Sequence, residues 1–301
     1  MRERRYGFGV LLVLTGATSL SLNGLLLRNL DEADGWQILF YRGVALFTAL
    51  FLILCAKYRR DTARAFLDIG LPGLWASLAL GLGSCFYVFA LLFTTVANAM
   101  FIIGSAPILT AAVAWVVLRE RLPMVGIIAM TVALCGIGLM FADGIIAGRW
   151  FGNVMAVFVV VGFVSYLLII RRQRNTDMLP VVCLTGLIMA AAGFIGAPHL
   201  NIPLHDVFIA ILMGSILYNV GFVSYTVAAR YILAAEVSLF AVFESILAPI
   251  WVWIGVSETP SVLTLTGSSL VFVAITTYCL VAISREKKSH SFATIAANAE
   301  T

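Results

Sequence analysis

Long apolar stretches, separated by short polar connections, follow one another along almost the whole 301-residue chain. A helix needs about 20 apolar residues to cross the hydrocarbon core of a bilayer. Ten stretches approach this length, so the pattern predicts an all-α membrane protein with ten transmembrane helices and no soluble domain between them. The predicted spans are 7–27, 36–56, 69–92, 97–118, 123–142, 150–170, 180–197, 207–229, 236–256 and 261–283.

The composition agrees with this pattern. Hydrophobic residues make up 62% of the chain and charged residues 11%, against about a quarter charged in soluble domains. The net charge of +4 does not indicate nucleic-acid binding, because the positions of the basic residues matter more than their sum. Each of the five cysteines stands alone in an apolar stretch, which favours buried apolar packing over a disulfide or a metal site. We therefore expect no cofactor and no nucleic-acid partner.

The basic residues predict the orientation, because cytoplasmic segments accumulate Lys and Arg. With the N-terminus inside, sixteen of the nineteen basic residues fall on the inner side. Arg28 and Arg149 fall outside, and Arg42 lies within a span. The sequence thus predicts two cytoplasmic termini, with residues 286–301 as a disordered tail, in a multi-pass protein of the cell inner (plasma) membrane.

A repeat divides the chain. Residues 225–258 align without a gap on residues 87–120, with matches such as Tyr87/Tyr225 and Glu120/Glu258. Five spans in each half is an odd number, so the halves 1–145 and 146–285 are expected to cross the membrane in opposite directions. Inverted repeats build secondary transporters, in which two halves rock around a site at the midplane.

Three segments carry a resemblance to a known family: QILFYRGVALFTA (37–49), APILTAAVAWVVLRERLP (106–123) and ESILAPIWVWIGVSETP (244–260). The paired segments resemble the EamA units of the drug/metabolite transporter superfamily, over about residues 10–285. Within this superfamily, the sequences of these segments are most similar to the YddG-type amino-acid exporters. The resemblance implies a helical basket around a central cavity, with spans five and ten at the periphery, that exports amino acids, aromatic ones included. The chain departs from the Glu-Pro found in many members: Ser245 follows Glu244, and Pro249 comes later, which puts the position of the second helix break in doubt.

Glu244 is an acid in the middle of an apolar stretch. A carboxylate in hydrocarbon costs several kcal/mol unless it is paired or faces water. It either faces a cavity, where it binds a substrate ammonium or carries a coupling proton, or is a structural acid bonded to a neighbouring group.

Arg42 lies about 9 Å along its helix from the predicted outer end, next to Tyr41. Its planar guanidinium matches a substrate carboxylate. The alternative is that it extends to the outer interface with its charge in water.

Polar and aromatic side chains recur at helical spacing. Ser215, Tyr218, Asn219, Phe222 and Tyr225 are expected on one face of span eight. Such a face lines a cavity for an amphipathic solute or forms hydrogen bonds between helices. The complete set of predicted substrate-binding residues is Glu244, Tyr87, Tyr218, Asn219, Tyr225, Tyr41, Arg42, Asn23, Ser19 and Ser165.

Helix breakers occur in matching regions of the two halves. Gly104 and Pro107 interrupt span four, and Ser245 and Pro249 lie in span nine. Breaks at corresponding positions point to a transport site, whereas the simpler alternative is a kink used only for packing.

These observations predict a secondary transporter that exports amino acids and similar small amphipathic metabolites by alternating access. A drug or other metabolite exporter is the alternative within the superfamily. A membrane enzyme or assembly protein is the alternative outside it, but Glu244 alone is not a catalytic set. The expected partners are a small-molecule substrate and the lipid bilayer, with proton coupling open and a monomer or weak homodimer as the oligomeric state.

Overall fold

The regular elements are all helices in the ranges that the computed structural model describes, which are residues 2–109, 113, 124–173, 176–231, 234–274 and 276–277. The helices are α1 (Arg2–Ser21), α2 (Asn23–Arg28), α3 (Gly35–Tyr58), α4 (Thr62–Asp68), α5 (Gly70–Phe93), α6 (Val96–Gly104), α8 (Met124–Ile146), α9 (Trp150–Arg172), α10 (Leu179–Gly196), α11 (Leu204–Leu212), α12 (Asn219–Ala228) and α13 (Ala234–Val256). A 3₁₀ turn covers Arg59–Asp61, a π-helix covers Met213–Tyr218, and a further helix covers Val262–Ala274.

Six helical segments are long and apolar enough to cross a membrane. They are Gly7–Arg28, Gly35–Asp68, Gly70–Phe93, Trp150–Ile170, Leu179–Gly196 and Leu204–Ala228. The other four predicted spans hold shorter apolar helices in the described ranges: Val96–Leu109, Thr131–Ile146, Val242–Val256 and Val262–Ala274. The all-α fold with several apolar helices is therefore confirmed, while the count of ten, the inverted repeat, the two halves and the orientation stay predictions. Glu120 and the tail 286–301 lie outside the described residues.

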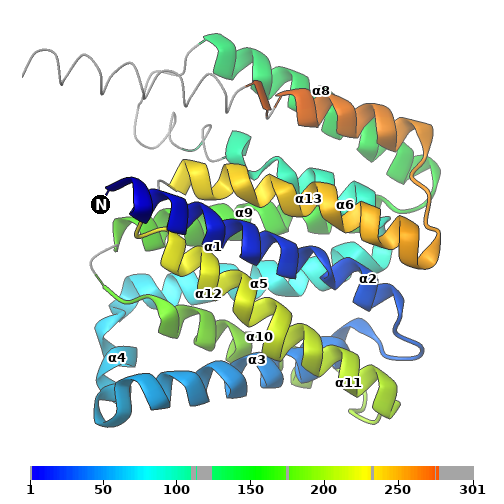
Figure 1. The fold of residues 1–301 in the computed structure, drawn as a ribbon. Helices are drawn as coiled ribbons and strands as arrows, with labels where there is room; N and C mark the ends of the chain where they lie inside the picture. Colours follow the sequence, from blue (N-terminus) through cyan, green and yellow to red (C-terminus); the bar gives the residue numbers. More distant parts are fainter. Residues whose placement is uncertain are drawn as a thin grey trace, which may run out of the picture.

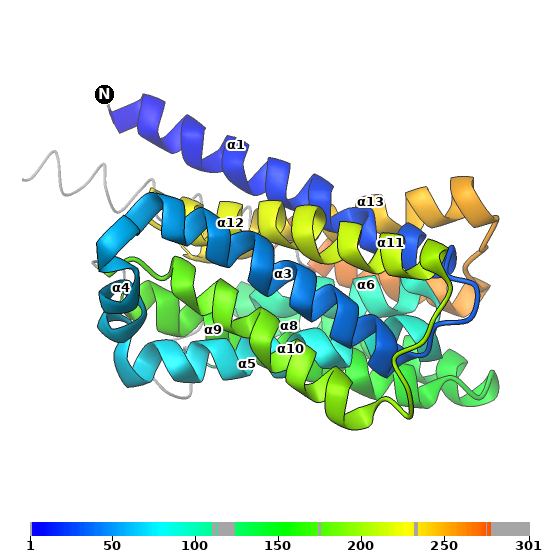
Figure 2. The ribbon, with the colours of Figure 1, turned by 90° about the horizontal axis from the view of Figure 1, so that it is seen from below.

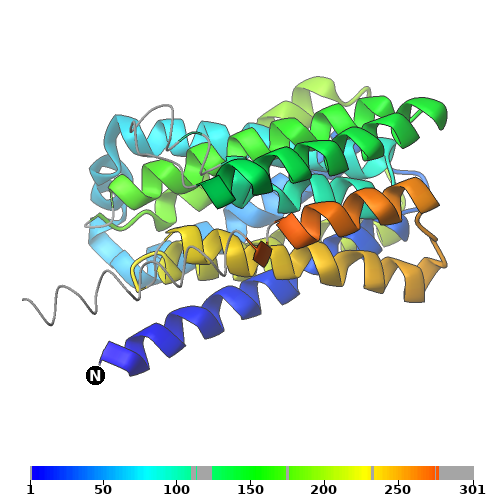
Figure 3. The same ribbon diagram turned by 90° about the horizontal axis from the view of Figure 1, so that it is seen from above.

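The helices form an elongated bundle and run roughly along one common axis (Figure 1). α3 packs along α10, α5 along α9, and α1 along α12 and α13. The views in Figures 2 and 3 show the same bundle from below and from above. Glycines allow the closest approach: a Cβ on Gly43 of α3 would lie 2.7 Å from the carbonyl oxygen of Gly186 of α10. Small residues at a helix contact are typical of membrane bundles, where packing rather than water exclusion drives association.

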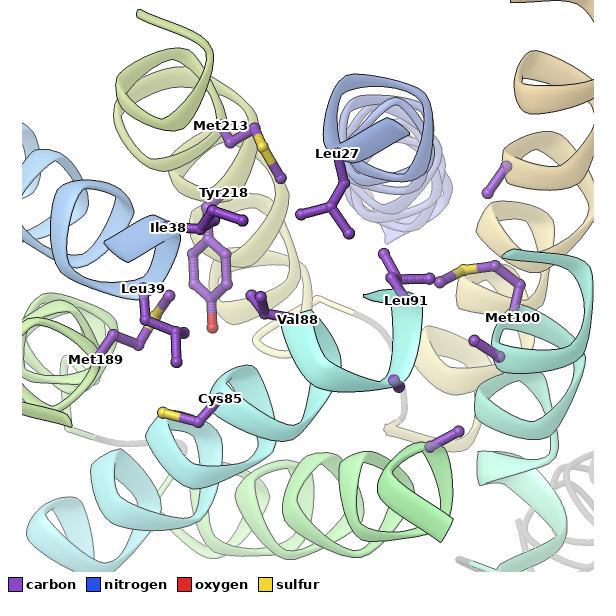
Figure 4. Close-up of a cluster of buried hydrophobic side chains, with 14 of the residues drawn as sticks. Leu27, Ile38, Leu39, Cys85, Val88, Leu91, Met100, Met189, Met213 and Tyr218 are labelled. Carbon is purple, nitrogen blue, oxygen red and sulfur yellow. The ribbon is translucent and has the colours of Figure 1, made fainter. Parts of the chain in front are cut away.

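An apolar core runs through the bundle and fixes the helices around its centre. Ile38, Leu39 and Val88 are each completely buried, and Leu27 is 3% exposed. In Figure 4 these side chains meet between α2, α3 and α5, and the ring of Tyr218 points from its own helix toward α5. The core therefore sets the spacing of α3 and α5, and the ring of Tyr218 fits into this space.

One end of the bundle, called the acidic end here, gathers the connections 29–34, 94–95, 147–149, 197–203 and 257–261. Asp206, completely buried in the first turn of α11, holds the connection between α2 and α3. Its carboxylate oxygens accept hydrogen bonds from the backbone N–H groups of Asp31, Glu32 and Ala33 at 3.0, 2.9 and 2.9 Å. Charge-assisted bonds of this kind are among the stronger ones in proteins, so the connection is fixed to α11.

Glu258 joins three elements at the same end. Its Oε2 accepts a hydrogen bond from Arg28 Nε at 2.7 Å, and its Oε1 accepts one from the N–H of Val96 at 2.8 Å. Arg28 also donates from Nη2 to the carbonyl oxygen of Thr94 at 2.8 Å. The first N–H groups of a helix have no partner inside it, so Glu258 satisfies one of them at the start of α6. The contacts tie α2 and the end of α13 to α6.

Asp177 joins three elements at the opposite end, called the basic end here, which gathers residues 58–62, 173, 176–178 and 229–231. Lys57 Nζ lies 2.6 Å from its Oδ2, and Arg230 Nη2 lies 2.7 Å from its Oδ1. The hydroxyl of Tyr58 donates to the same carboxylate. Segments predicted to share one side of the membrane thus meet at one end of the bundle.

We expect the contribution of Asp177 to stability to depend on pH. Partial burial opposes its charge, but hydrogen bonds from Lys57, Tyr58 and the Leu179 N–H, with Arg230 nearby, outweigh this effect and lower the pKa of the carboxyl below its ordinary value. A lowered pKa stabilises the folded state above the unfolded value of about 4, and this stabilisation is lost as the pH falls through the folded pKa.

Asp177→Asn is therefore expected to lower the free energy of unfolding by about 1 kcal/mol at pH 7, as for a partly exposed ion pair. The difference from wild type should shrink below about pH 4, because the wild-type carboxyl is then also uncharged. Thermal unfolding in detergent at several pH values measures both effects. A difference that stays constant down to pH 3 would contradict this account.

Candidate functional site

A cavity lies in the interior of the bundle, between α1, α3, α5, α6, α9, α12 and α13. Its volume is about 60 Å³, which is room for about four to six water-sized groups at 10–15 Å³ each. The lining residues are Leu20, Arg42, Leu80, Gly83, Ser84, Tyr87, Ile103, Gly104, Ala106, Pro107, Val159, Phe163, Tyr218, Phe222, Tyr225, Val242, Glu244 and Ser245. Most of the wall is apolar, and its two charged residues are Arg42 and Glu244.

Arg42 lies in the wall with its guanidinium close to two phenol rings. Its side chain is 1% exposed, and its Cζ atom lies 5.4 Å from the ring centre of Tyr87 and 5.1 Å from that of Tyr218. Its Nε and Nη1 atoms have no hydrogen-bond partner in the described part of the chain. Cation–π contacts of this kind contribute about 2 kcal/mol where water is excluded. The rings therefore stabilise a buried cation whose hydrogen-bonding capacity is left unused.

A π-helix places one of these rings. The segment Met213–Tyr218 departs from the α-helical pattern between α11 and α12, and such insertions are frequent at functional sites. A Cβ on Gly214 would overlap the carbonyl oxygen of Arg42, so only glycine lets this segment approach α3 so closely. The hydroxyl of Tyr218 makes a hydrogen bond with Ser84 of α5. Tyr218 is thus fixed beside the guanidinium of Arg42.

Glu244 lies on the cavity wall formed by α13. It stays partly exposed, in contrast to Arg42. The hydroxyl of Tyr225 donates to its Oε2 over 3.5 Å, a long distance for such a bond. The ion pairs of the described residues include neither Arg42 nor Glu244. The cavity therefore holds an acid and a base that are not paired with each other.

The predicted break in span four adjoins the cavity. α6 ends at Gly104, and the N–H of Ser105 donates back to the carbonyl oxygen of Ile102 at 3.1 Å. A Cβ on Gly104 would lie 2.8 Å from Ser245 Oγ, so the two regions that the repeat relates touch each other. The predicted break at Pro249 is wrong for this structure: α13 continues through Pro249 to Val256, and Pro249 does not line the cavity.

The structure brings five of the ten predicted binding residues to the cavity: Glu244, Tyr87, Tyr218, Tyr225 and Arg42. Asn219 is not among them. Its Nδ2 donates to the carbonyl oxygen of Ser215 in its own helix at 3.0 Å. Tyr218, Phe222 and Tyr225 line the cavity. Ser215 lies within the π-helix, and Asn219 lies one residue after Tyr218, about 100° further around the helix; neither lines the cavity.

The other four predicted residues also lie away from the cavity wall. The hydroxyl of Tyr41 donates to the carbonyl oxygen of Leu200 at 2.6 Å, toward the acidic end. Ser19 donates to Leu217, Asn23 to Leu20 and Ser165 to Val161, in each case to a backbone carbonyl oxygen. Of these bonds, that of Ser19 joins two helices, as the alternative for the polar pattern expected, whereas Asn23 and Ser165 bond three and four residues back along the chain.

Sequence reasoning missed the apolar part of the wall. Leu20, Val159 and Phe163 line the cavity, but an apolar residue in an apolar helix carries no local signal that separates a cavity wall from a packed core or from a lipid contact. Phe222 was placed on the correct face by its spacing, and its ring stacks on that of Tyr218 with centres 4.4 Å apart.

Comparison with known proteins finds a family match in the first part of the chain. Residues 7–142 match the EamA-like transporter family. That family consists of membrane transporters of the drug/metabolite transporter superfamily, in keeping with the apolar helices of the bundle. It is also consistent with a protein that is not an enzyme.

The comparisons beyond the EamA domain concern the fold. A solved structure titled "Crystal structure of protein" matches with a TM-score of 0.64 and 15% sequence identity, over 92% of this chain and 98% of that chain. At this identity the likeness shows the fold alone. No curated protein matches the chain.

Proposed function

We propose that the protein is a secondary transporter of the cell inner membrane that exports amino acids and similar small amphipathic metabolites through the central cavity. The observation that carries the proposal is the cavity itself, which places an unpaired acid and an unpaired base in a mostly apolar wall. An intramembrane ionisable residue is expensive and marks a transport path by default. The EamA domain supplies the transporter class, and the resemblance to YddG-type exporters supplies the amino-acid class and the outward direction.

Alternating access gives the two ends of the bundle their roles in this proposal. Glu258 links elements at the acidic end, and Asp177 links elements at the basic end. Each carboxylate holds its end closed, and release of one cluster at a time opens the cavity to one side. The touching regions at Gly104 and Ser245 lie where the two halves would tilt against each other.

The cavity size limits what this closed arrangement holds. About 60 Å³ accommodates the charged head of an amino acid and a short side chain. Aromatic amino acids need the enlargement that tilting of the halves provides. Small amino acids are therefore expected to be transported with the higher apparent affinity.

A counterflow assay tests the proposal. The purified full chain in liposomes is loaded with one unlabelled amino acid at a time, and accumulation of the same labelled amino acid is followed, with protein-free liposomes as the control. The proposal predicts transient accumulation for several amino acids. Folded protein with no flux for any member of the panel would overturn it.

A further inference from the structure

We propose that the cavity recognises both charged groups of a zwitterion at once, with the carboxylate bound by the unpartnered N–H groups of Arg42 and the ammonium bound by Glu244 and Tyr225. The inference rests on the proposed function and specifies its substrate: a molecule that carries both charges on one small head. The carboxylate site and the ammonium site are each inferred from different contacts.

The carboxylate site follows from the way in which Arg42 is enclosed. Its Cζ atom lies over the rings of Tyr87 and Tyr218, 5.4 and 5.1 Å from their centres, so these rings occupy part of the space around the guanidinium. Nε and Nη1 are buried and have no partner in the described part of the chain, so both offer N–H groups to a ligand. A carboxylate accepts charge-assisted hydrogen bonds from such groups.

The Tyr87 hydroxyl adds an observation at the same place. This oxygen is buried and without a partner in the described ranges, while its residue lines the cavity. A buried hydroxyl without a hydrogen bond is unfavourable by about 1–3 kcal/mol. The unused nitrogens of Arg42 are donors only, and the Tyr87 hydroxyl can donate as well, so together they suit an acceptor-rich anion.

The ammonium site follows from the position of Glu244. Its carboxylate is partly exposed in the cavity and shares only the long 3.5 Å contact with Tyr225. The ion pairs of the described residues do not join it to Arg42. Acid and base at separate positions in one cavity are complementary to a zwitterion, whose two charges neutralise both residues at once. A solute with one charge would leave the other residue uncompensated in a membrane interior.

Three competitors of the same carbon skeleton test the assignment in the counterflow assay. For leucine they are leucine itself, 3-methylbutylamine without the carboxylate, and 4-methylpentanoate without the amine. Each is titrated against flux of a labelled amino acid in wild type, Arg42→Gln and Glu244→Gln. Arg149→Gln and Glu32→Gln are the matched controls, because Arg149 pairs with Asp143 and Glu32 is exposed, both away from the cavity.

We expect leucine to inhibit wild type at least 10-fold better than either analogue. Arg42→Gln should weaken leucine and 4-methylpentanoate by about 10- to 100-fold, the range for one charged hydrogen-bonding group, and 3-methylbutylamine by less than threefold. Glu244→Gln should give the reverse pattern for the two analogues. The control variants should follow wild type.

Two results would overturn the assignment while flux persists: equal weakening of all three compounds in Arg42→Gln, or unchanged leucine inhibition in that variant. If Arg42→Gln does not fold, Arg42→Lys replaces it, because it keeps the charge but loses the planar guanidinium. It should weaken leucine and 4-methylpentanoate, and leave 3-methylbutylamine unchanged. Absence of flux in wild type is a separate outcome, which contradicts the proposed function itself.

Discussion

Alanine in place of Gly214 is expected to destabilise the protein and to abolish transport. Its Cβ would overlap the carbonyl oxygen of Arg42, and backbone cannot move aside as a flexible side chain can. Overpacking of this kind costs about 1–3 kcal/mol. Relief of the overlap moves the π-helix away from α3, so Tyr218 moves away from the Arg42 guanidinium.

The measurement is thermal unfolding in detergent together with counterflow. Gly138→Ala is the matched control, because the same methyl group on α8 meets nothing within 4 Å. It should leave flux unchanged and leave stability unchanged or raised by up to about 1 kcal/mol, since alanine favours a helix more than glycine does. Equal behaviour of the two variants would contradict the assigned packing of the π-helix on α3.

Glu258→Gln is expected to lower the free energy of unfolding by about 1–3 kcal/mol, the range for hydrogen bonds to charged groups. Glutamine keeps an acceptor for the Val96 N–H but loses the charge that pairs with Arg28. Arg28 is then left partly buried, with 23% of its side chain exposed. The effect should be larger than that of Asp177→Asn, because Lys57 and Arg230, the partners of Asp177, are more exposed than Arg28.

Unfolding curves of Glu258→Gln and Glu32→Gln make the comparison. Glu32 is exposed, and substitutions at such positions usually change stability by less than 0.5 kcal/mol. If the two variants unfold alike, Glu258 does not hold the acidic end, and the role proposed for it in alternating access fails as well.

The sequence predicted the helices well because hydrophobic length and polar connections are local signals. The predicted span 36–56 is α3 (Gly35–Tyr58), and 150–170 is α9 (Trp150–Arg172). The capping box of Asp34 and Gln37 at the start of α3 is a local signal of the same kind. The break at Gly104 was found for the same reason, whereas Pro249 shows that a helix tolerates proline when its neighbours support it.

The site was predicted only in part because burial and partners are not local properties. Arg42 and Glu244 were found because a charge in an apolar span is conspicuous. The sequence did not show that two tyrosine rings lie close to Arg42 or that its Nε and Nη1 lack partners. Asn219 was expected to share the face of Tyr218, but it is the next residue, about 100° further around the helix, and does not line the cavity.

The central claim is that the transported solute occupies this cavity, and cysteine labelling tests it directly. Val159 lines the cavity and is 8% exposed, while Val157 on the same helix is 38% exposed and faces outward. In a background free of the five native cysteines, Val159→Cys and Val157→Cys are treated with a thiol reagent, with and without amino acid. The account predicts that amino acid slows labelling of Val159→Cys alone and that labelling there stops counterflow. The account would be contradicted if amino acid left the labelling rate of Val159→Cys unchanged and the labelled protein kept its full flux.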